Sequence, residues 1–283
     1  MKKTLLIAAA ALAAGMLSVQ AQSNVYSQNI VGYVNQTIPA FSYQIIGSQL
    51  INGSDVNKTN GDINATLING LISSPNDPPN LSSNSQIYAW NGSSYTVYYF
   101  FNQADATTWF GGSPMPAGWY DGGGTPASIN LNSGKAAFIY NHSASPMTVA
   151  TSGQVFQGSN VVNTINTGYN LINLLVPVST NLVVDASGNA LPFGLPLNMT
   201  SSPVDPPSQS ANDTLFYWNG SSFTVYYYFN QADATAWFGG SPMPAGFYDG
   251  GGTPIPVNPS VNQGFFLYHN GPPINWTNTF FVQ

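Results

Sequence analysis

Short runs of apolar and aromatic residues, separated every 8–12 residues by Gly, Pro and Asn, make up most of the chain. This pattern is typical of the strands of an antiparallel sandwich or barrel, and no sustained 3.6-residue periodicity indicates helices. We therefore expect an all-β fold. The predicted strands are 30–35, 43–47, 86–90, 95–101 and 136–140, followed by 161–165, 169–175, 214–218, 223–229 and 264–268.

Two of the predicted strand pairs are separated by an Asn-Gly dipeptide, Asn91-Gly92 and Asn219-Gly220. Asn and Gly accept a positive φ at low cost, which makes this dipeptide a strong hairpin signal. We predict hairpins over 86–101 and 214–229.

The chain contains an internal repeat with an offset of 128 residues. Residues 73–126 align with 201–254 without a gap, and 41 of these 54 positions are identical. Only four of the 37 positions in 90–126 differ, and three of those exchange one aromatic ring for another. A unit of this length fits a domain-sized module rather than a solenoid repeat. We predict two tandem β-sandwich-like modules, 22–152 and 153–283, which touch and share edge strands.

The first residues resemble a signal peptide. Lys2 and Lys3 precede an apolar run over 5–17, and small residues stand at positions −3 and −1 of a cut after Ala21. The run is too short to span a bilayer. A buried N-terminal helix is the alternative. We expect export, removal of residues 1–21, and a mature chain with no transmembrane span, located outside the cell or on its surface.

Charged residues are scarce, at 5% of the chain against about 25% in average soluble proteins. Beyond the predicted signal, the chain has two Lys, Lys58 and Lys135, and ten Asp, so 2 − 10 gives a net charge of −8. Without a basic surface we expect no nucleic-acid partner and no attraction to anionic lipids. The absence of Cys removes thiol nucleophiles and Cys-based metal sites.

The most similar part of the repeat ends in a segment rich in aromatic rings, Gly and Pro, 102–126 and its copy 230–254. Exposed rings beside Asp would suit the apolar faces and hydroxyl edges of sugars. Alternatively, the rings pack over an open end of the sheet, or recent duplication alone explains the identity. The candidate ligand-binding residues are Trp109, Trp119, Tyr120 and Asp121, with their copies Trp237, Phe247, Tyr248 and Asp249.

Candidate catalytic and metal groups are few. The two histidines, His142 and His269, do not align between the copies, and no G-x-S-x-G motif occurs. Repeated Asp residues in turns favour a structural role, with a glycoside hydrolase as the alternative. The segment 55–62 has oxygen ligands at alternating positions, which indicates a weak Ca²⁺ site with Asp55, Asn57 and Asp62 as candidate ligands. However, the glycine comes one place late, and position 12 counted from Asp55 is Thr66 rather than Glu.

Several short segments carry a family resemblance: the heptad 29–35, the nonapeptide 90–98, 153–155 and 263–267. Together they resemble uncharacterised secreted bacterial repeat proteins of β-sandwich type, a family without an assigned activity. The resemblance implies a fold and export but no site residue. Copy one departs from the pattern at Lys135-Ala136-Ala137, where the aromatic residue of Gly264-Phe265 is missing.

Taken together, these features favour a non-enzymatic extracellular or cell-surface protein with a structural, adhesive or matrix role. Its expected partners are glycans, other extracellular proteins or further copies of itself, since edge strands without charged residues promote association. A carbohydrate-binding module is the alternative, and an Asp-based hydrolase is a third option. No cofactor is expected apart from the weak Ca²⁺ site.

Overall fold

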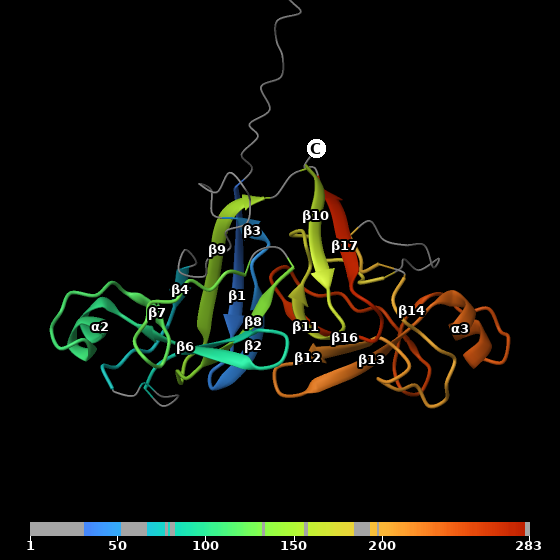
Figure 1. The fold of residues 1–283 in the computed structure, drawn as a ribbon, viewed down its shortest axis with the longest axis horizontal. Helices are drawn as coiled ribbons and strands as arrows, with labels where there is room; N and C mark the ends of the chain where they lie inside the picture. Colours follow the sequence, from blue (N-terminus) through green and yellow to red (C-terminus); the bar gives the residue numbers. More distant parts are fainter. Residues whose placement is uncertain are drawn as a thin grey trace, which may run out of the picture. The chain divides into compact units, whose positions relative to one another are not determined.

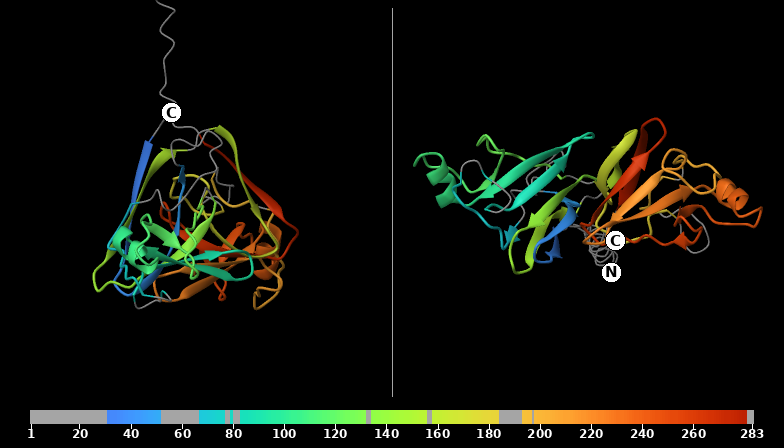
Figure 2. Two further views of the ribbon diagram at one scale, coloured as in Figure 1. Left: turned by 60° about the vertical axis from the view of Figure 1, so that its left-hand side comes forward. Right: turned by 90° about the horizontal axis from the view of Figure 1, so that it is seen from below.

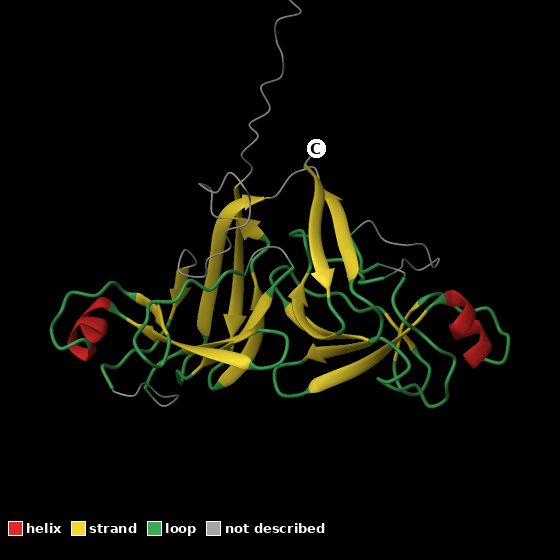
Figure 3. Ribbon diagram, in the orientation of Figure 1, coloured by secondary structure: helices red, strands yellow, loops and turns green. Residues whose placement is uncertain are grey.

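The structure, a computed structural model, describes residues 31–51, 67–76, 79, 83–131, 134–155, 158–183, 193–196 and 198–280. Strands and loops make up nearly all of this part, with two short helices (Figure 3). The all-β prediction is therefore confirmed. The predicted signal peptide, 1–21, lies outside these ranges. Within them, no helix has the length and apolar character needed to cross a membrane.

The first half forms two antiparallel sheets. One has the order β1-β9-β3 with β4 also on β9, and the other has the order β2-β8-β5-β6-β7. The elements are β1 (Val31–Ile38), β2 (Ser42–Gly47), β3 (Leu50–Ile51), β4 (Leu67–Asn69), β5 (Gln86–Trp90), β6 (Tyr95–Phe101), α2 (Gln103–Trp109), β7 (Gly118–Tyr120), β8 (Ala136–Asn141) and β9 (Met147–Val155).

The second half also forms two sheets, β10-β17 and β11-β16-β12-β13-β14-β15. Its elements are β10 (Gly158–Ile165), β11 (Gly168–Asn173), β12 (Thr214–Trp218), β13 (Phe223–Phe229), α3 (Gln231–Trp237), β14 (Gly246–Tyr248), β15 (Pro254–Ile255), β16 (Gly264–His269) and β17 (Ile274–Phe280). Strand β9 continues to Val155, three residues beyond the predicted boundary at 152.

The two halves pair their strands in the same register. Gln86 lies opposite Tyr99 in β5–β6, and Thr214 lies opposite Tyr227 in β12–β13, which is a shift of 128 on each strand. Both predicted hairpins are confirmed. Each turn is a four-residue loop, and in the first the Asn91 side chain accepts the backbone N–H groups of Ser93 and Ser94 at 3.0 and 2.9 Å.

Helices α2 and α3 were not predicted, because seven residues are too few to show helical periodicity. Each follows directly after a long strand, β6 or β13 (Figures 1 and 2). The Asn102 side chain accepts the Asp105 N–H at 2.9 Å, and the Asp105 carboxylate accepts from Asn102 Nδ2 at 2.7 Å. The first bond satisfies one backbone donor at the helix start, and the second joins the two side chains. Asn230 and Asp233 repeat both bonds in α3.

Each half has its own core between its two sheets, as in a sandwich. In the first half, Ile38 and Met147 from the β1–β9 sheet pack with Ile87 and Ile139 from the other sheet. In the second half, Trp276 of β17 packs with residues of β12 and β16. The long strands β1 and β9 run crosswise to β6 in Figure 1.

The halves meet through the outer faces of their larger sheets, in a pseudo-symmetric interface. Trp90 Nε1 donates to the Tyr169 carbonyl at 3.0 Å, and its counterpart Trp218 donates to the Tyr43 carbonyl at 2.8 Å. Phe138 lies among rings of the second half, 6.0 Å from Trp218. Each half thus offers the same patch to the other, as in an isologous dimer.

Close backbone approach at this interface requires a glycine. A Cβ on Gly264 would lie 2.4 Å from Ile45 Cγ2 and 2.6 Å from Ala136 Cβ. Among the described residues, the one ladder contact between the halves is an isolated bridge from Ile46 to Gln263. The halves therefore associate by face packing rather than by the extended sharing of edge strands that we expected.

Candidate functional site

The aromatic rings of the repeated segment pack inward. Trp119 and Tyr120 are 3% and 0% exposed, and their copies Phe247 and Tyr248 are 2% and 0% exposed. Trp109 is half-buried and stacks on Phe101, with ring centroids 4.5 Å apart and planes 8° apart.

The second half reproduces this packing. Trp237 stacks on Phe229 at 4.6 Å and 6°, and Tyr248 donates its hydroxyl to the Pro244 carbonyl at 2.5 Å. Because these rings pack against each other and against strand residues, their faces are not available to stack on a sugar. The packing alternative therefore describes Trp119, Tyr120, Phe247 and Tyr248, and they are not ligand-stacking rings in this conformation.

Asp121 and Asp249 close the glycine turn that follows these rings. Asp121 Oδ1 accepts the N–H groups of Thr125 at 2.8 Å and Gly123 at 2.9 Å. These bonds favour the ionised carboxylate, so the Thr125 N–H, followed by that of Gly123, lowers the pKa of Asp121. Asp249 has the same partners and the same direction of shift in its copy. Both carboxylates hold backbone, and neither has a raised pKa suited to a general acid.

Among the described residues of the second half, His269 and Asp213 form a buried pair. His269 Nδ1 lies 2.6 Å from Asp213 Oδ2, and His269 Nε2 lies 2.8 Å from the Pro272 carbonyl. The side chains are 1% and 0% exposed. The Asp213 carboxylate also accepts backbone N–H groups from Thr200 at 3.0 Å and Asn270 at 2.7 Å. Both ring nitrogens therefore lie against oxygen atoms, which hold the imidazole ring from two sides.

The first half has uncharged residues at the two equivalent positions. Ser85 replaces Asp213 and accepts the Ile72 N–H at 2.9 Å. Asn141 replaces His269, and its amide donates to the carbonyls of Ile38, Pro39 and Ser145 at 3.1, 3.0 and 2.9 Å. This equivalence explains why the histidines do not align. His269 is a structural residue, and His142 packs beside Phe41 and Tyr140.

The predicted Ca²⁺ ligands Asp55, Asn57 and Asp62 lie outside the described residues. In the ranges that the structure describes, no group of three or more His, Asp or Glu side chains is placed to hold a metal.

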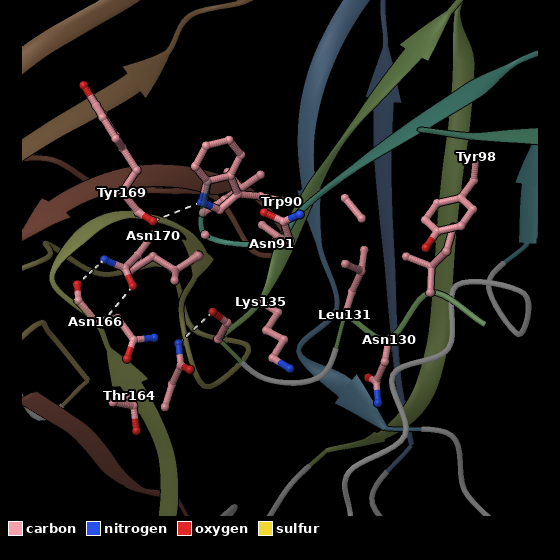
Figure 4. A pocket seen from close by; sticks show the side chains of 18 of the residues that line it. Trp90, Asn91, Tyr98, Asn130, Leu131, Lys135, Thr164, Asn166, Tyr169 and Asn170 are labelled. Atoms are coloured by element: carbon pink, nitrogen blue, oxygen red, sulfur yellow. Dashed lines mark hydrogen bonds between the residues drawn. The ribbon is translucent and has the colours of Figure 1, made fainter. Parts of the chain in front are cut away.

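A cavity of about 500 Å³ lies where the second half packs on the first, and the sequence analysis did not identify it. One wall comes from Ala89, Trp90, Tyr98 and Lys135, and the facing wall comes from the segment 163–172, which includes Asn166 and Tyr169. Figure 4 shows Lys135 extending into the space between Thr164 and Asn130. The lining is mixed, with amides, hydroxyls, rings and one amine.

Most amides around the cavity hold the chain in place. Asn170 donates to the carbonyls of Asn166 and Gly168 at 2.7 and 2.9 Å, and Asn163 donates to the Gly134 carbonyl at 2.8 Å. Lys135 is exposed and, within the described part of the chain, forms no ion pair. The amine is therefore the one cationic group that this wall offers to a ligand.

Comparisons of the chain with models of known protein families, with curated proteins and with solved structures gave no match.

Proposed function

We propose that this chain is a secreted, non-enzymatic extracellular or cell-surface protein with a structural, adhesive or matrix role. The observation that carries the proposal is the use of its few ionisable groups. Asp105 and Asp233 cap helices, Asp121 and Asp249 close turns, and His269 is buried against an aspartate. These described groups, which are of the types that a hydrolase would present to substrate, are bound to the chain's own backbone or to one another.

The strands support a role in contact with other molecules. No strand in the described ranges contains Lys or Asp, the residues that usually protect edges from pairing. Strand β1 pairs only with β9 there, so no strand in the described ranges pairs with its other edge. Tyr33 on β1 and Phe41 after it are 65% and 60% exposed. Self-association through this edge is therefore part of the proposal.

Sedimentation velocity of the mature chain, residues 22–283, tests assembly. We expect weight-average mass to rise with concentration, and Tyr33→Lys to suppress the rise by placing a charge on the edge strand. Ser113→Lys adds the same charge on an exposed loop and serves as the control. A strict monomer at high concentration, or equal suppression by both variants, would remove the assembly part.

Export is tested separately. When the full chain is expressed in a bacterium, we expect it outside the cytoplasm with an N-terminus at Gln22, as mass spectrometry would determine. Retention in the cytoplasm with residues 1–21 intact would contradict the proposed location. Hydrolase activity on polysaccharides that is lost in Asp121→Asn with Asp249→Asn would contradict the non-enzymatic role.

A further inference from the structure

The cavity between the halves results from a difference between the two copies. Position 89 is Ala, and the equivalent position 217 is Tyr, which lies in an otherwise matching hairpin. In the second half the Tyr217 hydroxyl donates to Gln263 Oε1 at 2.9 Å. In the first half the equivalent of Gln263 is Lys135. The second half thus has a tyrosine ring hydrogen-bonded to a glutamine at these two positions, whereas the first half has an alanine and a lysine beside the cavity.

A second exchange lies beside the first. Ala89 pairs with Ala137 across β5 and β8, whereas the equivalent of Ala137 is the buried Phe265. Two neighbouring aromatic residues are therefore replaced by alanine on the same sheet face. Losing large side chains from a packed face leaves volume unless the surroundings collapse. Ala89 lines the cavity, and the facing wall is the segment 163–172 of the second half, whereas Ala137 is buried beside Ala89.

We propose that this cavity binds a saccharide that carries a carboxylate, such as a uronic acid unit of a polysaccharide. The inference goes beyond the proposed contact role and rests on it in one respect, that the ligand lies outside the cell. A volume of about 500 Å³ is within the range of small-molecule sites. The exposed Asn166 side chain lines the cavity, and its amide can both donate to and accept from sugar hydroxyls.

Two features of the lining select this ligand class. Two aromatic residues, Trp90 and Tyr98, are part of the lining, and aromatic side chains suit the apolar face of a pyranose ring. The Lys135 amine has no carboxylate partner in the described part of the chain, so a ligand carboxylate would gain a charge-assisted bond. A phosphate-rich ligand such as nucleic acid is disfavoured, because the chain carries ten Asp and this wall offers one cation.

Isothermal titration calorimetry of the mature chain with trigalacturonate, and with cellotriose as the neutral counterpart, tests the proposal. We expect trigalacturonate to bind and cellotriose to bind at least tenfold more weakly. Lys135→Gln should weaken trigalacturonate binding about tenfold, as expected for a bond to a charged group, and Lys135→Arg should retain most of it. Higher salt should weaken binding to the wild type.

Ala89→Tyr with Lys135→Gln places in the first half the residue pair that the second half carries. Because the same backbone accommodates that pair, we expect an unchanged midpoint of thermal unfolding and no detectable binding. Absence of trigalacturonate binding by the wild type would overturn the proposal. Undiminished binding by the double variant, or equal affinity for cellotriose, would also overturn it. These results are independent of sedimentation and export, so failure here is distinguishable from failure of the proposed role.

Discussion

The buried pair of His269 and Asp213 permits a specific prediction about stability. His269→Ala removes a donor from an aspartate with 0% exposure and leaves the Pro272 carbonyl without its partner. Removing one member of a buried ion pair costs about 3–5 kcal/mol, because the remaining charge is uncompensated. Asp213 keeps two backbone donors, from Thr200 and Asn270. We therefore expect a loss near the lower limit, about 3 kcal/mol.

Urea unfolding followed by circular dichroism measures this loss. With a slope near 3 kcal/mol per M, at the upper end for small proteins, about 3 kcal/mol corresponds to a midpoint shift of about 1 M. The first half supplies the control, since it carries Ser85 and Asn141 at the equivalent positions. Asp213→Ser combined with His269→Asn replaces both partners together, so we expect it to destabilise less than His269→Ala.

The cycle formed by Asp213→Ser, His269→Asn and the double variant gives the coupling energy directly. We expect the double variant to be more stable than the sum of the single losses predicts, by at least 1 kcal/mol, a coupling typical of residues in contact. Additive losses, or a His269→Ala effect below about 0.5 kcal/mol, which is the range of surface substitutions, would refute the mutual dependence of this pair.

Three further predictions concern the repeated turn and the interface. Gly252→Ala should lower the free energy of unfolding in urea by about 1–2 kcal/mol, because φ is +88° at this residue. The control Gly250→Ala, where no atom lies within 4 Å of an added Cβ, should be near neutral. Equal effects of the two substitutions would contradict this. Asp121→Asn combined with Asp249→Asn should destabilise the protein at neutral pH. The difference from wild type in the free energy of unfolding should vanish as pH falls through the lowered pKa values, because the wild-type carboxylates are then protonated. A difference that stays constant down to pH 2 would argue against this. Trp218→Phe keeps a ring but loses a 2.8 Å bond to the other half, so a loss of about 1 kcal/mol is expected, and an unchanged unfolding midpoint would exclude it.

Local signals in the sequence were sufficient for the hairpins. The bounds of β5, β6, β12 and β13 equal the predicted ones, because alternating aromatic residues and an Asn-Gly turn act over a few neighbouring positions. The Asn-x-x-Asp cap of α2 was also visible in the sequence. It was missed because a seven-residue helix contains too few turns to reveal an apolar face.

The roles of the aromatic rings required the tertiary structure. The sequence left Trp119 and Tyr120 open to packing or to ligand binding, since both uses favour rings near glycine. The structure decides between packing and ligand binding, because both side chains are buried where β7 pairs with β6. Similarly, His269 and Asp213 are 56 residues apart, and nothing local indicates that they meet.

By itself, the sequence determined the all-β class, the repeated order of strands and the near absence of charge, which follow from composition and short-range pattern. The position of the cavity was decided by the tertiary structure alone. Aligning the copies shows Ala89 opposite Tyr217 and Lys135 opposite Gln263. Only the packing of 163–172 against β5 and β8 shows that the missing ring leaves a space with an amine at its wall. Contacts between residues so distant in sequence depend on how whole sheets pack, which no local pattern specifies.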